Sequence, residues 1–319
     1  MIDPEIASVL GPKTKAVNRT FNFEGAEIIT QFMQCSTESD TLIVRFHGAI
    51  QRENRPLPAF QANLKQMQGY AHQITVCDPT MMTREGFSLG WYSGHEALDV
   101  QNILRRFFAQ VREFLGIRRM IYLGSSGGGF AALHYSYFDS DSAAVVMGPQ
   151  TSMRAHIPAA LNAYVKNCWP GRSFEEVGQS IETDMCALYG NGHENSVIFV
   201  QSSGDFLHNH RHMAPFVNAV HGGGTRENKR FVLVSDFWGR QGHAGAIPHE
   251  GYIALLLAAI SARSLESTDI LDAYAAAAEK PLAVPTSLSK RSDVAGPDGA
   301  SLRLADILRD YHLRQPMES

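Results

Sequence analysis

The sequence predicts an α/β protein with a doubly wound, mostly parallel sheet and antiparallel strands at its start. Short apolar, β-branched runs alternate with helical patterns from residue 41 to residue 263, which is typical of a parallel sheet covered on both faces. The runs at 18–25 and 26–35 instead alternate apolar and polar residues around Glu24 and Gly25, as in a hairpin. Hydrophobic residues make up 44% of the 319 residues and charged residues 19%, so a substantial core is expected.

The elements after the hairpin follow from local periodicity. Apolar residues recur at helical spacing from Val100 to Leu115, and Gly116 supplies a stop signal. The expected strands lie at 41–50, 72–79, 119–123, 143–148, 195–203 and 230–236. The expected helices lie at 58–70, 97–116, 128–138, 214–222 and 249–263.

Two segments fall outside this alternation. Residues 149–194 lie between two expected strands and are too long for an ordinary connection, so we expect a helical insertion there. Residues 265–319 carry an Ala-rich helical pattern at 269–279 and an amphipathic one at 301–313. We therefore expect one domain over 1–264 and a C-terminal helical extension over 265–319, which offers a contact for a homo-oligomer.

Charge and cysteine content exclude several classes of protein. The net charge is −4 and the thirteen histidines are scattered, so no basic face is available for nucleic acid or an anionic membrane. No apolar stretch has the pattern of a signal peptide or the length of a membrane span, so we expect a cytoplasmic protein. The four cysteines are far apart without CxxC spacing, as expected for reduced thiols.

A glycine-rich stretch, "GSSGGG" from residue 124 to residue 129, carries the main chemical signal. Gly124 to Gly128 match G-x-S-x-G, the nucleophile elbow, between an expected strand and an expected helix. The glycines are needed because strand and helix approach so closely that a Cβ would clash. A phosphate-binding loop is the rival interpretation, but the stretch lacks both the G-x-G-x-x-G register and a Walker lysine. Ser126 is therefore the predicted nucleophile, with Ser125 as its neighbour.

A nucleophilic serine requires a base and an acid that orients it. Asp205 follows the expected strand 195–203, and His243 follows the expected strand 230–236. Both positions lie at the carboxyl edge of the sheet, where ligands bind in such folds. Asp236 remains an alternative for the acid, and His249 remains an alternative for the base.

The chain also contains candidate oxyanion donors and substrate contacts. The amide of Gly127 follows the nucleophile, and Ala49 or a neighbour offers a second donor after the His-Gly pair that ends strand 41–46. We name His47, Trp91 and Phe206 as candidate substrate contacts.

Three histidines, His208, His210 and His212, resemble a metal cluster at first sight. No cysteine or acidic ligand completes an evident zinc pattern there, so a structural or substrate-lining role is expected. We expect no metal and no cofactor.

Taken together, residues 17 to 263 resemble the α/β-hydrolase superfamily, through "HGA" at 47–49, "GSSGG" at 124–128, and Asp205 and His243 in that order. The resemblance implies that Ser126 attacks a carbonyl, His243 carries its proton, Asp205 orients the imidazole, and Gly127 and Ala49 bind the oxyanion. The motifs "GSSGGGFAAL", "VVMGPQTS" and "SSGDFLHNHRHMAPF" are similar to bacterial serine hydrolases found near glycan-biosynthesis genes, some of which are O-acyltransferases or deacetylases. The insertion at 149–194 and the tail after residue 264 depart from a minimal hydrolase.

These observations predict a serine hydrolase that cleaves a carboxylic ester through an acyl-enzyme on Ser126. One alternative is an O-acyltransferase or deacetylase with the same triad, acting on a saccharide or another small hydroxylated molecule. A second is a binding protein that uses the fold without catalysis. The expected partner is a small-molecule ester or an acylated glycan.

Overall fold

The computed structural model describes residue 6 and residues 15–224, 227–243, 247 and 249–279. The strands are β1 (Ala16–Phe23), β2 (Ala26–Met33), β3 (Thr41–Phe46), β4 (His72–Val76), β5 (Arg119–Ser125), β6 (Ser142–Met147), β7 (Ser196–Ser202) and β8 (Phe231–Asp236). Within the described residues they form one eight-stranded sheet in the order β1-β2-β4-β3-β5-β6-β7-β8. Strand β2 is antiparallel to β1 and to β4, and the pairs from β4 to β8 are parallel. The predicted fold class is confirmed.

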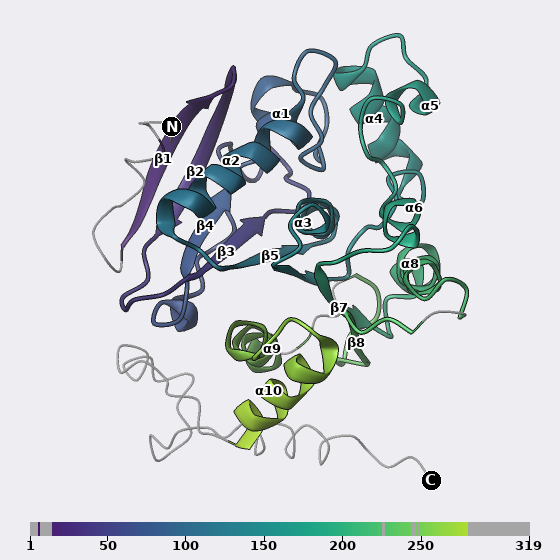
Figure 1. Cartoon of the computed structure of the whole chain (residues 1–319). Helices are drawn as coiled ribbons and strands as arrows, with labels where there is room; N and C mark the ends of the chain where they lie inside the picture. Colours follow the sequence, from purple (N-terminus) through teal and green to yellow (C-terminus); the bar gives the residue numbers. More distant parts are fainter. Residues whose placement is uncertain (1–5, 7–14, 225–226, 244–246, 248, 280–319) are drawn as a thin grey trace.

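Helices cover both faces of this sheet. The helices are α1 (Pro79–Thr83), α2 (Val100–Leu115), α3 (Gly127–Tyr137), α4 (Pro158–Cys168), α5 (Phe174–Val177), α6 (Met185–Gly190), α7 (Phe206–His208), α8 (Ala214–Val220), α9 (His249–Ser261) and α10 (Ser267–Glu279). Leu42 and Val44 of β3 pack in a core cluster with α2, α3, α6 and α8, whereas Ile43 packs in a second cluster with α9. Figure 1 shows α9 and α10 on the opposite side of the sheet from α2 and α3.

The first hairpin forms where the pattern placed it. Strands β1 and β2 are joined by Glu24 and Gly25, with φ angles of 49° and 82°. Two consecutive positive φ angles are typical of a type I′ turn, whose twist matches that of the flanking strands.

The helix predicted at 58–70 is wrong. Only Lys65–Met67 form a 3₁₀ turn there. The side chain of Gln73 on β4 accepts from the backbone N–H of Leu64 and donates to its carbonyl, at 2.9 Å each. Arg45 on β3 donates to the carbonyl of Ala62. Sheet side chains thus satisfy backbone groups that a helix would pair internally.

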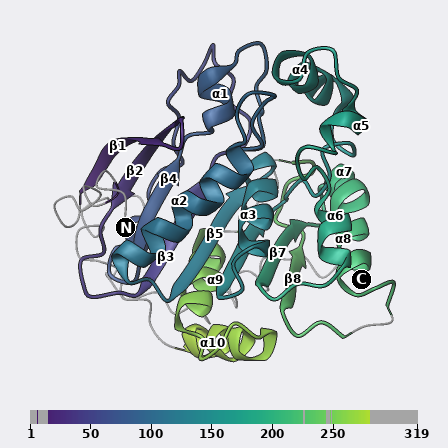
Figure 2. The same cartoon turned by 45° about the horizontal axis from the view of Figure 1, so that its top comes forward.

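The segment between β6 and β7 contains α4, α5 and α6. Figure 2 shows α6 beside α8, with α4 and α5 farther toward the top of the view. Buried tyrosines tie the segment to the rest of the chain, because Tyr164 donates to the carbonyl of Gly94 at 2.9 Å and Tyr189 donates to that of Leu133 at 2.8 Å. The Ala-rich pattern forms α10, whose Ile270 packs in the cluster of α9. The pattern at 301–313 lies outside the described residues.

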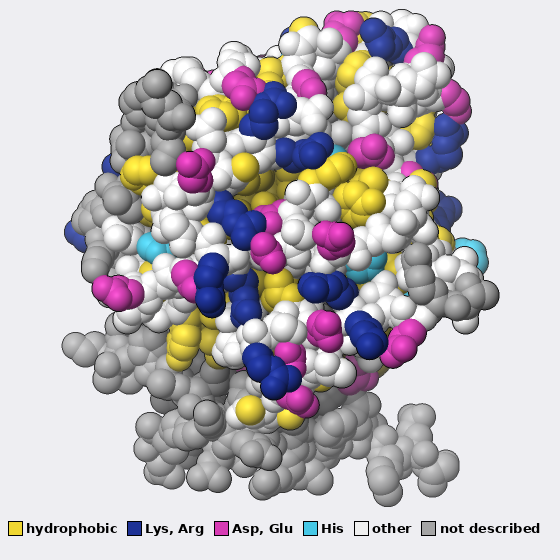
Figure 3. All heavy atoms as spheres, viewed as in Figure 1, with side chains coloured by type: hydrophobic (Ala, Val, Ile, Leu, Met, Phe, Trp, Pro, Cys, Tyr) yellow, Lys and Arg dark blue, Asp and Glu magenta, His cyan; other side chains and the backbone are white. Residues whose placement is uncertain are grey.

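The surface carries charges of both signs. Figure 3 shows lysine and arginine side chains interspersed with aspartate and glutamate over the face that it displays. Among the described helices, none has both the length and the hydropathy required to span a bilayer.

Helix α3 buries a histidine whose ring nitrogens have no polar partner among the described residues. His134 is 2% exposed, and neither ring nitrogen has a hydrogen-bond partner among the described residues. Burial, together with the charge of Arg105, lowers its pKa from 6.5 to about 3. As the pH falls below 6.5, this histidine is protonated in the unfolded chain but stays neutral in the folded chain. The free energy of unfolding therefore decreases as the pH falls from 6.5 toward about 3.

We expect His134→Phe to stabilise the protein, increasingly so in acid. The gain in free energy of unfolding should be about 1 kcal/mol at pH 7, because an unsatisfied buried polar ring is removed. It should grow by a further ~2 kcal/mol at pH 5, where only the unfolded wild-type chain is protonated at this position. Urea unfolding at both values measures this, with the exposed His210→Gln as control. An equal gain at pH 5 and pH 7 would contradict the assignment.

Candidate active site

Ser126 occupies the sharp turn between β5 and α3. Its φ and ψ are 53° and −123°, a backbone conformation that non-glycine residues rarely adopt and that concentrates at functional sites. It is the N-cap residue of α3, but its side chain makes no capping hydrogen bond. The backbone N–H of Ser126 donates to the carbonyl of Met147 at 3.2 Å, which fixes the turn against the end of β6.

The glycines beside Ser126 are required by close backbone contacts. A Cβ on Gly124 would lie 2.1 Å from the carbonyl oxygen of Gly128, and a Cβ on Gly128 would lie 2.5 Å from that of Phe46. Real side chains do not approach backbone atoms this closely. The glycines of the G-x-S-x-G stretch therefore allow α3 to pack closely against the backbones of β3 and β5.

Asp205 and His243 form a hydrogen-bonded pair. Asp205 follows β7 and caps α7, where its Oδ1 accepts from the N–H of His208 at 3.3 Å. Its Oδ2 lies 2.8 Å from Nδ1 of His243. Burial opposes ionisation of Asp205, but the hydrogen bond from His243 and the charges of His208 and His243 outweigh it and lower the pKa of Asp205. An ionised Asp205 holds the proton of His243 on Nδ1 and leaves Nε2 as an acceptor.

The loop of His243 reaches the end of β6 next to Ser126. Gly242 donates to the carbonyl of Gly204 at 2.8 Å, which joins this loop to the loop of Asp205. A Cβ on Gly148 would lie 3.4 Å from Cε1 of His243, and Gly148 directly follows the residue that accepts from the Ser126 amide. No hydrogen bond joins the described side chains of Ser126 and His243, and such bonds often tighten only with substrate bound.

The remaining alternatives for acid and base lie elsewhere. Oδ1 of Asp236 accepts from the N–H of the next residue, Phe237, at 2.7 Å. Nε2 of His249 lies 2.9 Å from the side-chain nitrogen of Gln66. Neither of these contacts involves the Asp205–His243 pair.

The two candidate oxyanion donors are the first residue of α3 and a residue of the loop after β3. Gly127 is the first residue of α3, where a backbone N–H has no acceptor within the helix. A Cβ on Gly48 would lie 3.6 Å from Cβ of Ser126, and Ala49 follows it on the surface. The loop after β3 therefore packs directly against the serine.

Two of the three candidate substrate contacts are buried, and contact of any of the three with a substrate stays a prediction. His47 is 2% exposed, and its Nε2 accepts from the N–H of Asp78 at 3.1 Å. Burial lowers the pKa of His47 to about 4, so the ring is neutral and holds the loop in place. Trp91 is 1% exposed. Phe206 alone lies on the surface, with 81% of its area exposed beside Asp205.

Gln150 is a site residue that the sequence reasoning missed. Its Nε2 donates to Oγ of Ser126 at 3.0 Å, and its Oε1 accepts from Nε1 of Trp91 at 2.6 Å. Trp91 thereby fixes the orientation of the amide that touches the serine. The only sequence signal was the Gly148-Pro149 turn after β6.

Four histidine rings form a row between Asp205 and Gln150, in the order His243, His208, His212 and His156. The rings of His243 and His208 stack with centroids 4.0 Å apart and planes at 12°. His208 lies 5.0 Å from His212 between centroids, and His212 lies 6.3 Å from His156. Burial and the neighbouring charges lower the pKa of His212 to about 3 and that of His156 to about 4, so both are neutral at pH 7.

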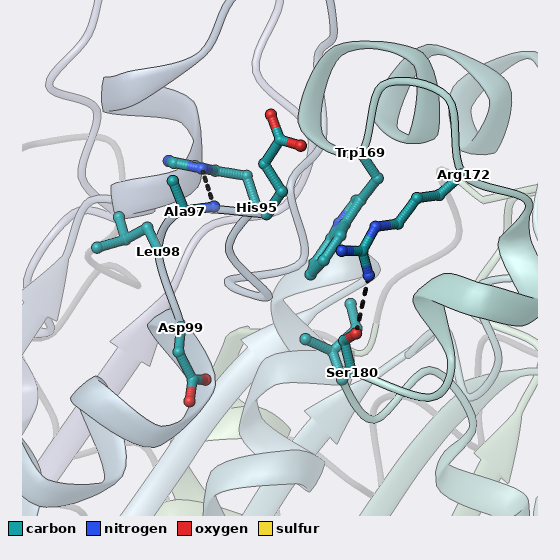
Figure 4. Close-up of a pocket in the computed structure, with 9 residues that line it drawn as sticks. His95, Ala97, Leu98, Asp99, Trp169, Arg172 and Ser180 are labelled. Atoms are coloured by element: carbon teal, nitrogen blue, oxygen red, sulfur yellow. Dashed lines mark hydrogen bonds between the residues drawn. The ribbon is translucent and has the colours of Figure 1, made fainter.

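A separate polar hollow lies outside this site. Figure 4 shows it between the residues before α2 and the segment that contains Trp169. Its lining includes neither Ser126 nor the Asp205–His243 pair. The indole of Trp169 donates to Tyr164 at 3.1 Å, and the ring of Tyr164 lies 5.4 Å from that of Trp91 between centroids, so an aromatic layer links the hollow to the far side of Gln150.

No protein-family model matches the chain, and no curated protein matches it. Solved structures do match. The capsule O-acetyltransferase of Neisseria meningitidis serogroup A, in complex with CoA, aligns with a TM-score of 0.51 and 14% identity over 71% of this chain and 88% of its own.

Two peptidases are similar as well. Dipeptidyl peptidase 4 of Porphyromonas gingivalis aligns with a TM-score of 0.51 and 10% identity over 71% of this chain and 32% of its own. An acylaminoacyl peptidase aligns with a TM-score of 0.50 and 14% identity over 72% of this chain and 38% of its own. The chain thus spans about a third of the length of each peptidase. At these identities the likeness concerns the fold alone.

Proposed function

We propose that this chain, which has the α/β-hydrolase fold, cleaves carboxylic esters through an acyl-enzyme formed on Ser126. One observation carries the proposal. The hydrogen-bonded pair of Asp205 and His243 lies at the same sheet edge as Ser126. The backbone of this serine is strained, and its side chain makes no capping hydrogen bond to α3. The fold neighbours are enzymes, which agrees with a catalytic rather than a purely binding role.

The proposed reaction has two steps. His243 Nε2 accepts the proton of Ser126 Oγ as Oγ bonds to the ester carbonyl carbon, and the amides of Gly127 and Ala49 bind the oxyanion. The intermediate then collapses, the bond to the alcohol breaks, and the alcohol leaves with the proton from His243. A water or a second hydroxyl compound attacks the acyl-enzyme in the same way. Asp205 keeps the proton of His243 on Nδ1 throughout.

Gln150 prepares the serine for this step. Because its amide donates to Oγ of Ser126, one lone pair of the hydroxyl is already occupied. The hydroxyl hydrogen remains available for Nε2 of His243. Gln150 therefore acts as a positioning residue for the nucleophile.

Transfer of the acyl group to a saccharide hydroxyl, or deacetylation of an acylated glycan, is the second candidate. The extent of the likeness to the capsule O-acetyltransferase supports it, since the alignment covers 88% of that chain but only 32% of the dipeptidyl peptidase. The exposed aromatic rings of Phe206 and Phe237 beside the Asp205 loop offer an apolar surface for an acyl group or a sugar face.

A panel of acyl esters, offered with and without saccharide acceptors, tests the proposal. The free acid and the transferred product are measured in the same reaction. We expect acid release in the absence of acceptor. Transfer that outruns hydrolysis would favour the acyltransferase, whereas neither product from any ester, together with no labelling by a fluorophosphonate, would contradict the serine mechanism.

A further inference from the structure

The Asp205–His243 pair is part of a larger cluster of metal-ligating groups. His208 lies one turn after Asp205, and its Nδ1 is 3.0 Å from the same carboxylate oxygen, Oδ2, that contacts His243. One ligand atom from each of the three side chains lies within 4.8 Å of the other two. Ligand atoms of a tetrahedral zinc ion with bonds of about 2 Å are separated by similar distances, so only small movements are needed to close around a cation.

His208 is a buried histidine whose hydrogen-bonding capacity is incompletely satisfied by the described residues. Its side chain is 5% exposed, and among the described residues neither ring nitrogen has a partner in hydrogen-bonding geometry. Leaving such a group unsatisfied in the interior is costly, and each case requires an explanation. An imidazole nitrogen without a partner beside a carboxylate is a candidate metal ligand.

The set of donors selects the kind of cation. Two imidazoles and one carboxylate suit Zn²⁺, and a water supplies the fourth position of a tetrahedral site. The His243 side chain is 48% exposed, so a cation reaches the cluster from solvent. The sequence pattern around the histidines at 208–212 did not identify an acidic ligand. In the structure that ligand is Asp205, which the turn into α7 places beside His208.

We propose that Asp205, His208 and His243 form a Zn²⁺ site whose occupation is incompatible with the use of His243 as a base. The effect on catalysis rests on the function proposed above; the binding of zinc does not. A zinc ion between Oδ2 of Asp205 and Nδ1 of His243 takes the lone pair of Nδ1. The ring proton of His243 then resides on Nε2, which no longer accepts the proton of Ser126. Release of zinc restores the proton to Nδ1 and the lone pair to Nε2.

Calorimetric titration of the full chain with ZnCl₂ tests the site directly. We expect one Zn²⁺ per chain for the wild type and the same affinity for Ser126→Ala, because the serine is no ligand. His208→Gln and Asp205→Asn each remove a ligand and should weaken zinc binding by more than about tenfold. Loss of a residue that only hydrogen-bonds to a metal ligand already weakens binding by about that factor. The exposed His210→Gln is the matched control and should bind as the wild type does. The site would be overturned if the wild type bound no zinc, or if both ligand variants bound zinc as tightly as the wild type does.

Fluorophosphonate labelling tests the competition with catalysis. Zinc should slow labelling of the wild type by about tenfold or more, EDTA should restore it, and His208→Gln should be labelled at the same rate with and without zinc. Undiminished labelling of a zinc-loaded wild type would overturn the competition. If the metal-free wild type is not labelled at all, the proposed ester chemistry fails, while the titration of Ser126→Ala still decides whether the zinc site exists.

Discussion

Replacing Ser126 with alanine is expected to lower kcat for ester cleavage by about 10⁴-fold or more, because no other group supplies the attacking oxygen. Labelling by a fluorophosphonate should disappear at the same time. The loss should lie in kcat rather than KM, since the removed bond forms only after the substrate is bound. Gln150 and Trp91 remain in place when Oγ is removed, so folding should be preserved.

Ser125→Ala is the matched control for this prediction. It removes the same hydroxyl one residue earlier, at the end of β5 opposite Met147 of β6. We expect labelling and turnover close to those of the wild type and an unchanged urea midpoint. Labelling that survives in Ser126→Ala, or that vanishes in Ser125→Ala, would move the nucleophile to another residue.

The second large effect is expected from Gly124→Ala. The added Cβ would lie 2.1 Å from the carbonyl oxygen of Gly128 and 2.8 Å from the amide nitrogen of Gly129, and both are backbone atoms that no rotamer change removes. The strand and the helix must therefore separate. We expect a loss of about 3 kcal/mol in the free energy of unfolding, at the upper end of the usual cost of overpacking. Urea unfolding measures this loss.

Activity should fall further than this loss of stability explains. Separation of β5 from α3 shifts Ser126 and the amide of Gly127 together, and misplacement of about 1 Å is enough to cost about 10²-fold in rate. Gly69→Ala is the control, because the nearest atom to its Cβ would be Oγ of Ser36 at 3.9 Å. That variant should differ from the wild type by less than about 0.5 kcal/mol. Equal stabilities of the two variants would show that the close crossing is absent.

Most of the sheet was predictable because its strands have strong local patterns. Strands β3 and β4 are buried along their whole length, since both faces of the sheet are covered, and the Glu24-Gly25 turn marks the only early hairpin in the described region. The segment 58–70 was mispredicted for a different reason. Its backbone groups bind Gln73 and Arg45, which come from strands outside the segment. No periodicity within 58–70 contains that information.

Candidate functional residues divide in the same way. His47 and Trp91 were named from the sequence as candidate substrate contacts, and in the structure both side chains are buried. Gln150 was missed because its contact with Ser126 depends on the loop after β6 lying beside the loop after β5. The two loops are neighbours because β5 and β6 are adjacent parallel strands. No single segment of the sequence specifies which strands are adjacent.

The sequence alone determined the fold class, the place of Ser126 in a turn too tight for side chains, and the chain order of serine, acid and histidine. These follow from local physics, namely the periods of strands and helices and the steric need for glycine at Gly124 and Gly128. Only the three-dimensional arrangement paired Asp205 with His243 and brought His208 against it. Such contacts join the ends of different strands, so they depend on sheet order and loop packing, which arise from the folded chain as a whole.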